Sequence, residues 1–132
     1  MAGHAFLSFV VEDLELVKMF RGQAKNKKSD LSFDDYSVTT PFNSTNADYI
    51  RGQITQKIKN ASVTICLIGT TTASSQWVKW EIEKSDSLGK RLLGVRLHSD
   101  SAKDVAPPAL VAAGAKVVNW DIDDIVKFIN ES

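Results

Sequence analysis

A glutamate and a tryptophan four positions apart mark the part of the sequence best suited to chemistry. They lie in the stretch SSQWVKWEIEK, residues 74–84, where the spacing of apolar residues predicts a helix over residues 76–88. At about 100° per residue, Trp77 lies on the apolar face of that helix and Glu81 falls inside the same face. Glu83 points the other way and is expected to be a surface carboxylate. Glu81 is therefore the candidate for a specialised role.

A carboxylate on an apolar helix face loses hydration, and this loss favours its neutral form. Burial without a partner is costly, so Glu81 is expected to line a cleft or to meet a hydrogen-bond donor. The helix is predicted to begin near Ser74 or Ser75, at the carboxyl end of a strand, and Glu81 lies about 9 Å along the axis from that edge at 1.5 Å per residue. A structural role, in which Glu81 only accepts hydrogen bonds from a loop, stays open at this point.

Short apolar runs alternate with segments of helical period along the chain. Strands are predicted at residues 4–11, 31–37, 62–69, 90–97 and 116–120. Helices are predicted at residues 12–25, 48–60 and 76–88, as one turn after Pro108, and as a terminal helix capped by Asp121. This alternation predicts an α/β fold, with a five-stranded parallel sheet and helices on both faces. The preferred topology is the flavodoxin-like order 2-1-3-4-5, which places a ligand crevice between the carboxyl ends of strands one and three.

The composition is that of one ordinary domain covering residues 1–132. Hydrophobic residues make up 43% of the chain, which is enough for a sizeable core. The formal net charge is zero, so the basic footprint of a protein that binds nucleic acid or an anionic membrane is missing. The sequence shows no signal-peptide pattern and no membrane-spanning run, and a single cysteine favours a reducing compartment. A cytoplasmic protein is expected.

Three segments resemble the signature motifs of Toll/interleukin receptor (TIR) domains, in the order and spacing of that family. HAFLSF, followed by an acidic helix start, resembles the first motif, and the loop after the second strand matches the position of the BB loop. SSQWVKWEIEK resembles the W-x-x-x-E motif, and GKRLLGV resembles the strand that follows it. The resemblance covers residues 4–97 and is nearest to the bacterial TIR-like group of Thoeris anti-phage systems. From residue 98 onward it is only positional.

This resemblance implies an enzyme that cleaves NAD⁺ between nicotinamide and ribose. In catalytic TIR proteins the glutamate of the motif is essential, and this role carries onto Glu81, with Trp77 supporting the site. In Thoeris-type members the ADP-ribose part is commonly released as a cyclic signal that activates a separate effector protein. NAD⁺ is then the substrate, and neither another cofactor nor a metal is expected. Self-association of TIR domains is expected as well.

Further substrate-binding candidates follow the strand ends and the BB loop. Ser8 and Phe9 lie near the end of strand one, and Phe9 either stacks on a ring of the ligand or packs in the core. Asp35 ends strand two and either contacts ribose or caps the turn. The other candidates are Thr39, Phe42 and Ser44 in the BB loop and Gly69 and Thr70 after strand three. Backbone donors at the last two positions could meet a phosphate, although a glycine needed for the turn explains the sequence equally well.

Rival functions of the same fold can be compared at the same positions. A phosphoacceptor receiver needs an aspartate after strand three and a lysine after strand five, where this chain has LIGTTT and VVNW. A flavodoxin needs a phosphate loop rich in Ser, Thr and Gly after strand one, where this chain has SFVVED. The remaining alternative is a non-catalytic TIR module that acts by assembly. Such modules often lack the glutamate that is present here as Glu81.

Overall fold

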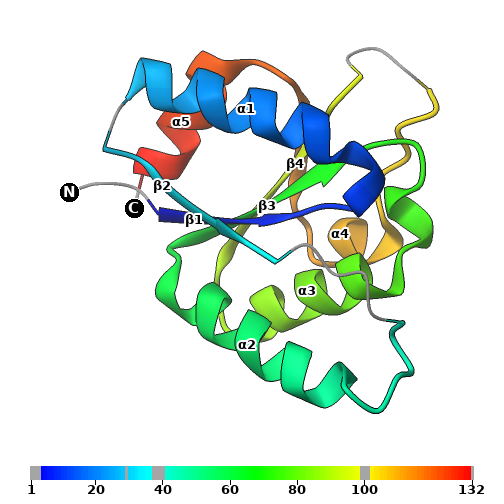
Figure 1. The fold of residues 1–132 in the computed structure, drawn as a ribbon. Coiled ribbons are helices and arrows are strands. Elements are labelled where there is room, and N and C mark those ends of the chain that lie inside the picture. The colour runs from blue at the N-terminus through cyan, green and yellow to red at the C-terminus, as the bar shows by residue number, and fades with distance from the viewer. Residues whose placement is uncertain (1–3, 29, 37–40, 99–101, 132) are drawn as a thin grey trace.

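The computed structural model describes residues 4–28, 30–36, 41–98 and 102–131. Its strands form one parallel sheet in the order β2-β1-β3-β4-β5, which confirms the predicted α/β class and flavodoxin-like topology (Figure 1). The strands are β1 (His4–Ser8), β2 (Ser32–Asp35), β3 (Val63–Ile68), β4 (Arg91–Arg96) and β5 (Lys116–Asn119). The helices are α1 (Leu14–Lys27), α2 (Ala47–Asn60), α3 (Gln76–Ser87), α4 (Pro108–Ala112) and α5 (Ile122–Asn130), with 3₁₀ turns η1 (Val11–Asp13) and η2 (Thr72–Ser74).

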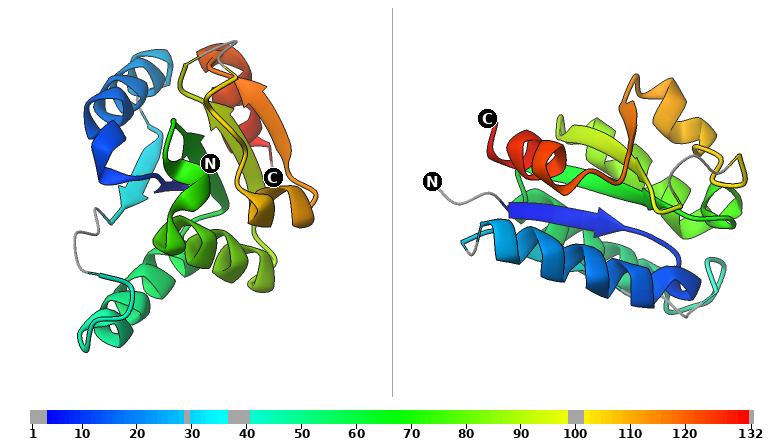
Figure 2. Two further views of the ribbon diagram at one scale, coloured as in Figure 1. Left: turned by 90° about the vertical axis from the view of Figure 1, so that its right-hand side faces the viewer. Right: turned by 90° about the horizontal axis from the view of Figure 1, so that it is seen from above.

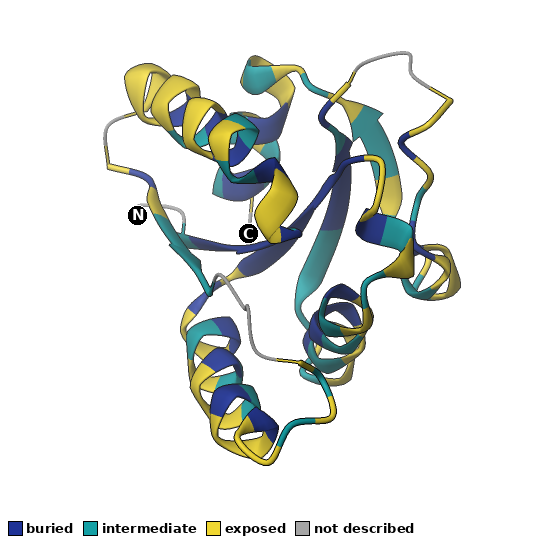
Figure 3. Ribbon diagram, turned by 45° about the vertical axis from the view of Figure 1, so that its right-hand side comes forward, coloured by how far each residue is buried: buried dark blue, intermediate teal, exposed yellow. Residues whose placement is uncertain are grey.

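Helices cover both faces of the sheet, α1 and α5 on one face and α2, α3 and α4 on the other (Figures 1 and 2). The central strand β3 is buried along its whole length. Its side chains alternate between the two faces, so Ile65 packs in the core under α1 and α5, and Ile68 packs in the core under α3 and α4. This explains why its sequence is a continuous apolar run. Figure 3 shows the same division, with buried residues along the strands and exposed residues on the outer helix faces.

The first strand is shorter than its apolar run predicts. β1 ends at Ser8 rather than at residue 11, because the chain leaves the sheet through η1, where the Asp13 N–H donates to the Val10 carbonyl at 3.0 Å. Val10 still packs in the apolar cluster beside α3. Burial of this residue outside the sheet explains why the apolar sequence continues past the strand.

The helix that carries Glu81 is fixed to the sheet near both of its ends. At its start, the Ser75 hydroxyl accepts a hydrogen bond from the Val78 N–H at 3.2 Å and caps α3. Near its end, the Ser85 hydroxyl donates to the Thr64 hydroxyl of β3 at 2.9 Å, and both groups are buried. The rotation of α3 about its axis is therefore set by contacts on either side of Glu81.

The C-terminal part follows the predicted pattern, although its sequence is less regular. α4 is the single turn predicted after Pro108, and its Leu110 is fully buried against β4. A Cβ atom at Gly94 of β4 would lie 2.6 Å from the Leu110 side chain, so only glycine allows this close packing. Asp121 caps α5, as predicted, and accepts a hydrogen bond from the Asp124 N–H at 3.3 Å. The described helices include none that is long and apolar enough to cross a membrane.

Candidate active site at the carboxyl ends of β1 and β3

Glu81 is buried against the carboxyl end of β1, with only 3% of its surface exposed. Ser8, the last residue of β1, is fully buried and donates its hydroxyl to Glu81 Oε1 at 2.6 Å. Ser8 and Phe6 point to the same face of the sheet because alternate residues of a strand do so, and Phe6 packs in the cluster that includes Ile50 of α2. The donor that the sequence requires for Glu81 is therefore supplied by the first strand.

Glu81 also lines a cavity of about 250 Å³. Three aromatic side chains from different parts of the chain form part of its wall: Phe9 after β1, Tyr36 after β2 and Trp77 in α3. The remaining lining residues are Val10, Val11, Glu12, Thr71, Ser74 and Ser75. The cavity lies at the edge of the sheet where open α/β folds bind their ligands. Both expectations for Glu81, a donor and a cleft, are confirmed.

Burial raises the pKa of the Glu81 carboxyl group to about 8, because the charged form loses its hydration. The hydrogen bond from Ser8 acts in the opposite direction, since it stabilises the charged form, and the negative charge of Asp35 adds to the increase. With this pKa, Glu81 is mostly protonated at neutral pH. A cation that enters the cavity would favour its ionisation, so the charge of Glu81 can respond to a ligand.

Asp35 ends β2 and is held by an ion pair with α1. Arg21 Nη1 donates to Asp35 Oδ2 at 2.7 Å. Asp35 acts on Glu81 through its charge, but it is not among the residues that line the cavity. The next residue, Tyr36, forms the wall instead. The predicted contact of Asp35 with a ligand stays a prediction.

The BB-loop candidates are brought to the site only in part. The Phe42 ring packs edge-on against the Trp77 ring, with centroids 5.0 Å apart, and so reaches the cavity wall through Trp77. The Ser44 hydroxyl accepts a hydrogen bond from the Asn46 N–H at 3.0 Å and holds the turn before α2. Thr39 lies outside the described residues.

Gly69 is explained by the close approach of another residue rather than by its turn. Its φ is not in the left-handed range, but a Cβ atom here would lie 2.1 Å from Asp13 Oδ2. The Gly69 N–H already donates to the Thr72 hydroxyl at 2.8 Å, so a phosphate would have to displace this bond. Thr70 is exposed and is not among the residues that line the cavity. Phosphate binding at these two positions stays a prediction.

Several lining residues were not predicted from the sequence. Glu12 directly follows the apolar run of the first strand, and this position is a signal that could have identified it. Thr71 donates its hydroxyl to Glu12 Oε2 at 3.1 Å across the rim of the cavity. Ser74 and Ser75 reach the cavity through the shape of the η2 turn, for which the sequence carries no clear signal.

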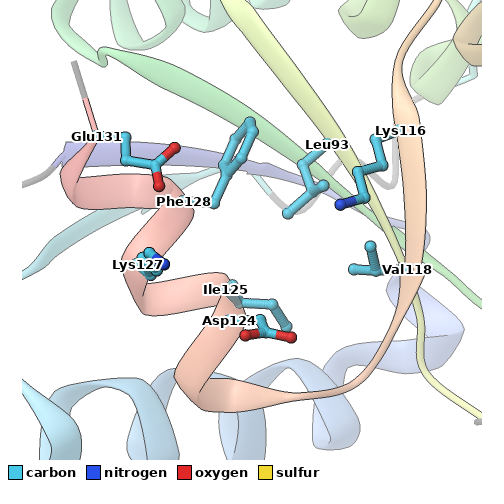
Figure 4. Close-up of a pocket in the computed structure, with 8 residues that line it drawn as sticks. All are labelled: Leu93, Lys116, Val118, Asp124, Ile125, Lys127, Phe128 and Glu131. Carbon is cyan, nitrogen blue, oxygen red and sulfur yellow. The ribbon is translucent and has the colours of Figure 1, made fainter.

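A second cavity, of about 260 Å³, lies between α5 and the β4–β5 edge of the sheet (Figure 4). Its lining contains none of the predicted site residues and consists of Leu93, Lys116, Val118, Asp124, Ile125, Lys127, Phe128 and Glu131.

Within the described part of the chain, no three His, Cys, Asp or Glu side chains are close enough together to hold a metal ion.

The strand order and the Trp77–Glu81 pair beside the carboxyl end of β1 define a TIR-like α/β domain. Residues 6–102 match the family model of the Thoeris protein ThsB, TIR-like domain. The chain belongs to this family. It is 29% identical over 103 residues to ThsB1 of Bacillus cereus (strain MSX-D12), whose name assigns it provisionally as a cyclic ADP-D-ribose synthase. That match covers 75% of this chain and 54% of ThsB1, so the chain spans about half the length of this relative.

Solved structures share the fold at low sequence identity. The CMP N-glycosidase BcmB of Clostridium botulinum superposes with a TM-score of 0.60 at 11% identity, over 96% of this chain and 98% of that one. The TIR domains of the activated Roq1 resistosome give a TM-score of 0.50 at 19% identity, over 72% of this chain and 57% of that one. These similarities concern the fold alone.

Proposed function

We propose that this chain cleaves NAD⁺ between nicotinamide and ribose, with Glu81 as the catalytic carboxylate. Membership of the ThsB TIR-like family and the name of the Bacillus cereus relative support this activity. The observation that carries the assignment is the Ser8–Glu81 hydrogen bond of 2.6 Å in the wall of a cavity lined by aromatic rings. A buried acid, held by a donor and facing a cavity, suits chemistry on an electron-poor sugar.

The nicotinamide end of NAD⁺ is the part that suits this cavity. Its ring carries a positive charge, and aromatic faces such as those of Phe9, Tyr36 and Trp77 attract cations. The same charge would favour the ionised form of Glu81. A volume of about 250 Å³ is below the range typical of pockets for whole drug-sized ligands. We therefore place only nicotinamide and its ribose inside the cavity, with the rest of the dinucleotide outside.

Bond cleavage in this proposal needs no strong acid. The electron pair of the C1′–N bond leaves with the nicotinamide nitrogen, so the cationic ring departs as a neutral molecule. Positive charge develops on the ribose, as in glycoside cleavage, and the Glu81 carboxylate, which is almost fully buried, stabilises it. Water then attacks C1′ and gives ADP-ribose with release of a proton, or an internal nucleophile attacks and gives a cyclic product.

We extend the proposal to a cyclic ADP-ribose that acts on a separate effector protein, in keeping with the name of ThsB1. Cyclisation requires an adenine nitrogen or a ribose hydroxyl to lie near C1′ before water arrives. Mass spectrometry of the product distinguishes the cyclic form from linear ADP-ribose, because hydrolysis adds one water. A linear product alone would leave cleavage intact and remove the cyclisation step.

Self-association is a further part of the proposal, since assembly would exclude water from a cavity that lies at the sheet edge. It predicts that turnover per molecule rises with protein concentration. The alternative function, a non-catalytic TIR module that acts by assembly, predicts self-association without nicotinamide release.

The test compares nicotinamide release by wild type, Glu81→Gln and Glu83→Gln. In Glu81→Gln the new amide can still accept the Ser8 hydrogen bond but cannot ionise, so release falls about a hundredfold to a thousandfold. Glu83 is exposed on the same helix, and its variant should match wild type. Equal release by wild type and Glu81→Gln would remove Glu81 from catalysis. No release by wild type at any protein concentration would favour the assembly module.

A further inference from the structure

Arg51, near the start of α2, joins two segments that border the candidate site. Its guanidinium carbon lies 4.4 Å from the centroid of the Phe42 ring and 5.4 Å from the centroid of the Trp77 ring. Arg51 Nη2 donates to the Phe42 carbonyl at 3.0 Å, and Nη1 donates to Asp48 Oδ1 at 2.8 Å. One cation therefore ties the turn before α2 to the tryptophan of α3.

Arginine is required for this set of contacts. Its planar guanidinium group presents its faces to rings while its N–H groups donate in the plane to two acceptors. Lysine carries the same charge on a single ammonium group and lacks the planar fork of donors with which Arg51 contacts both rings and donates to two acceptors. The side chain of Arg51 is only 24% exposed, whereas that of Asp48 is 97% exposed, so the ring contacts and the bond to the Phe42 carbonyl are the protected part of this set.

Trp77 transmits the effect of Arg51 to the cavity. Its ring lies between Phe42 and Trp80, whose centroid is 6.3 Å from that of Trp77, and it lines the cavity with Glu81 one helical turn further along. A shift of this ring would change the space beside Glu81. We propose that Arg51 is a positioning residue for this site, which holds Trp77 in the cavity wall and so sets the affinity for a ligand that carries a flat ring.

Arg91 offers a matched control for this proposal. Its guanidinium carbon lies 4.1 Å from the Phe128 ring centroid, and it donates to the Glu131 carbonyl and pairs with the Glu131 carboxylate at 3.9 Å. It therefore makes the same three kinds of contact as Arg51. Phe128 and Glu131 line the second cavity, away from Glu81.

The first measurement follows Trp77 without any ligand. Acrylamide quenching of tryptophan fluorescence is compared between each arginine variant and the same variant carrying Trp77→Phe, and the difference reports Trp77 alone. Arg51→Gln should expose Trp77 to the quencher, and Arg91→Gln should leave it as shielded as in wild type. Arg51→Lys should give an intermediate loss of shielding, because it keeps the charge but not the planar guanidinium group with its several N–H donors. It also serves as the milder variant if Arg51→Gln folds poorly.

The second measurement rests on the proposed function and uses NAD⁺. Arg51→Gln should raise KM about tenfold with little change in kcat, because Trp77 loses the cation–ring contact that holds it in the cavity wall. Arg91→Gln should keep the wild-type KM. Unchanged shielding of Trp77 in both Arg51 variants would overturn the proposal, as would a lower kcat at unchanged KM. If wild type does not cleave NAD⁺, the proposed function fails, while the quenching result still decides the role of Arg51.

Discussion

The two cavities are similar in volume, about 250 and 260 Å³, but their walls differ in chemistry. The cavity at Glu81 contains an enclosed carboxyl group with a hydroxyl donor and three aromatic rings. The cavity beside α5 has an apolar floor that includes Leu93, and charged side chains such as Lys116 and Lys127 that are exposed to water (Figure 4). Size alone does not distinguish them. A buried ionisable group does.

The direction of the chain explains this difference. Ser8 is the last residue of β1 and the helix α3 begins after β3, so Glu81 is brought to the carboxyl ends of two strands. The second cavity lies on the opposite face, where Lys116 begins β5 and Glu131 follows the end of α5. Lys116 and Glu131 are both exposed to water there, and none of the described carboxyl groups that line the wall is buried.

The largest difference should appear in the pH dependence of stability. The folded pKa of Glu81 is about 8 and its ordinary value is 4.5, so between these values the folded protein keeps a proton that the unfolded chain has lost. Wild type therefore loses stability as the pH rises through this window. Glu81→Gln lacks this loss, and above pH 8 its free energy of unfolding should exceed that of wild type by up to about 5 kcal/mol, at about 1.4 kcal/mol per pKa unit.

Urea unfolding at pH 5, 7 and 9 measures this difference between the variants. Glu131→Gln is the matched change at the second cavity, where the carboxylate is exposed. Because Glu131 is exposed, this change should alter the free energy of unfolding by less than about 0.5 kcal/mol. A constant difference between Glu81→Gln and wild type across the series would mean that the folded state does not perturb the Glu81 carboxyl group.

The next largest effect should come from Gly69, which packs against Asp13 next to the cavity at Glu81. A Cβ atom at Gly69 would overlap the Asp13 carboxyl group, so Gly69→Ala should cost about 1–3 kcal/mol of stability. Gly52 in α2 has open space around its Cα, and Gly52→Ala should instead stabilise the protein by about 0.5–1 kcal/mol. Thermal unfolding of both variants gives the comparison. If Gly69→Ala melts at the same temperature as wild type, the Asp13 side chain moves aside without loss of stability.

A smaller effect is expected from Ser8. Ser8→Ala removes the donor that favours the charged form of Glu81, so the pKa of Glu81 rises further and kcat/KM for NAD⁺ at pH 7 should fall about tenfold. The loss should shrink at higher pH, where Glu81 ionises without help. Ser85→Ala removes another buried hydroxyl of the same region, one that bonds to the Thr64 hydroxyl and to the Glu81 backbone carbonyl but not to the Glu81 carboxyl group, and should not change the shape of the pH profile. A pH-independent loss in Ser8→Ala would point to packing instead.

The smallest effect should come from the second cavity itself. Lys116 is exposed, so Lys116→Gln should change stability by less than about 0.5 kcal/mol and leave nicotinamide release unchanged. Kinetics and urea unfolding of the same preparation check both points. A marked loss of nicotinamide release would mean that the cavity beside α5, and not only the cavity at Glu81, takes part in the activity.

The fold and Glu81 could be predicted because both depend on local periodicity. Alternating strand and helix patterns identify the sheet, and an acid on the apolar face of residues 76–88 shows up on a helical wheel. The length of β1 was predicted wrongly because Val10 is buried outside the sheet. Apolar residues after a strand end look the same in the sequence whether they pair in the sheet or pack beside it.

The finer details of the site could not be predicted because they depend on contacts between distant residues. The need for glycine at Gly69 comes from Asp13, which lies far earlier in the chain, and the setting of Trp77 comes from Phe42 and Arg51. Asp35 ends the second strand, as predicted, but its ion pair with Arg21 joins that strand to the helix α1. No pattern within one element carries such information.

The most direct test of the central claim is the pH dependence of kcat/KM for nicotinamide release by wild type. If ionised Glu81 does the chemistry, kcat/KM rises about tenfold per pH unit in the acidic range and levels off near the pKa of about 8. A profile that is flat from pH 5 to pH 9, or that levels off near the ordinary glutamate pKa of 4.5, would contradict the assignment of a buried, catalytic Glu81.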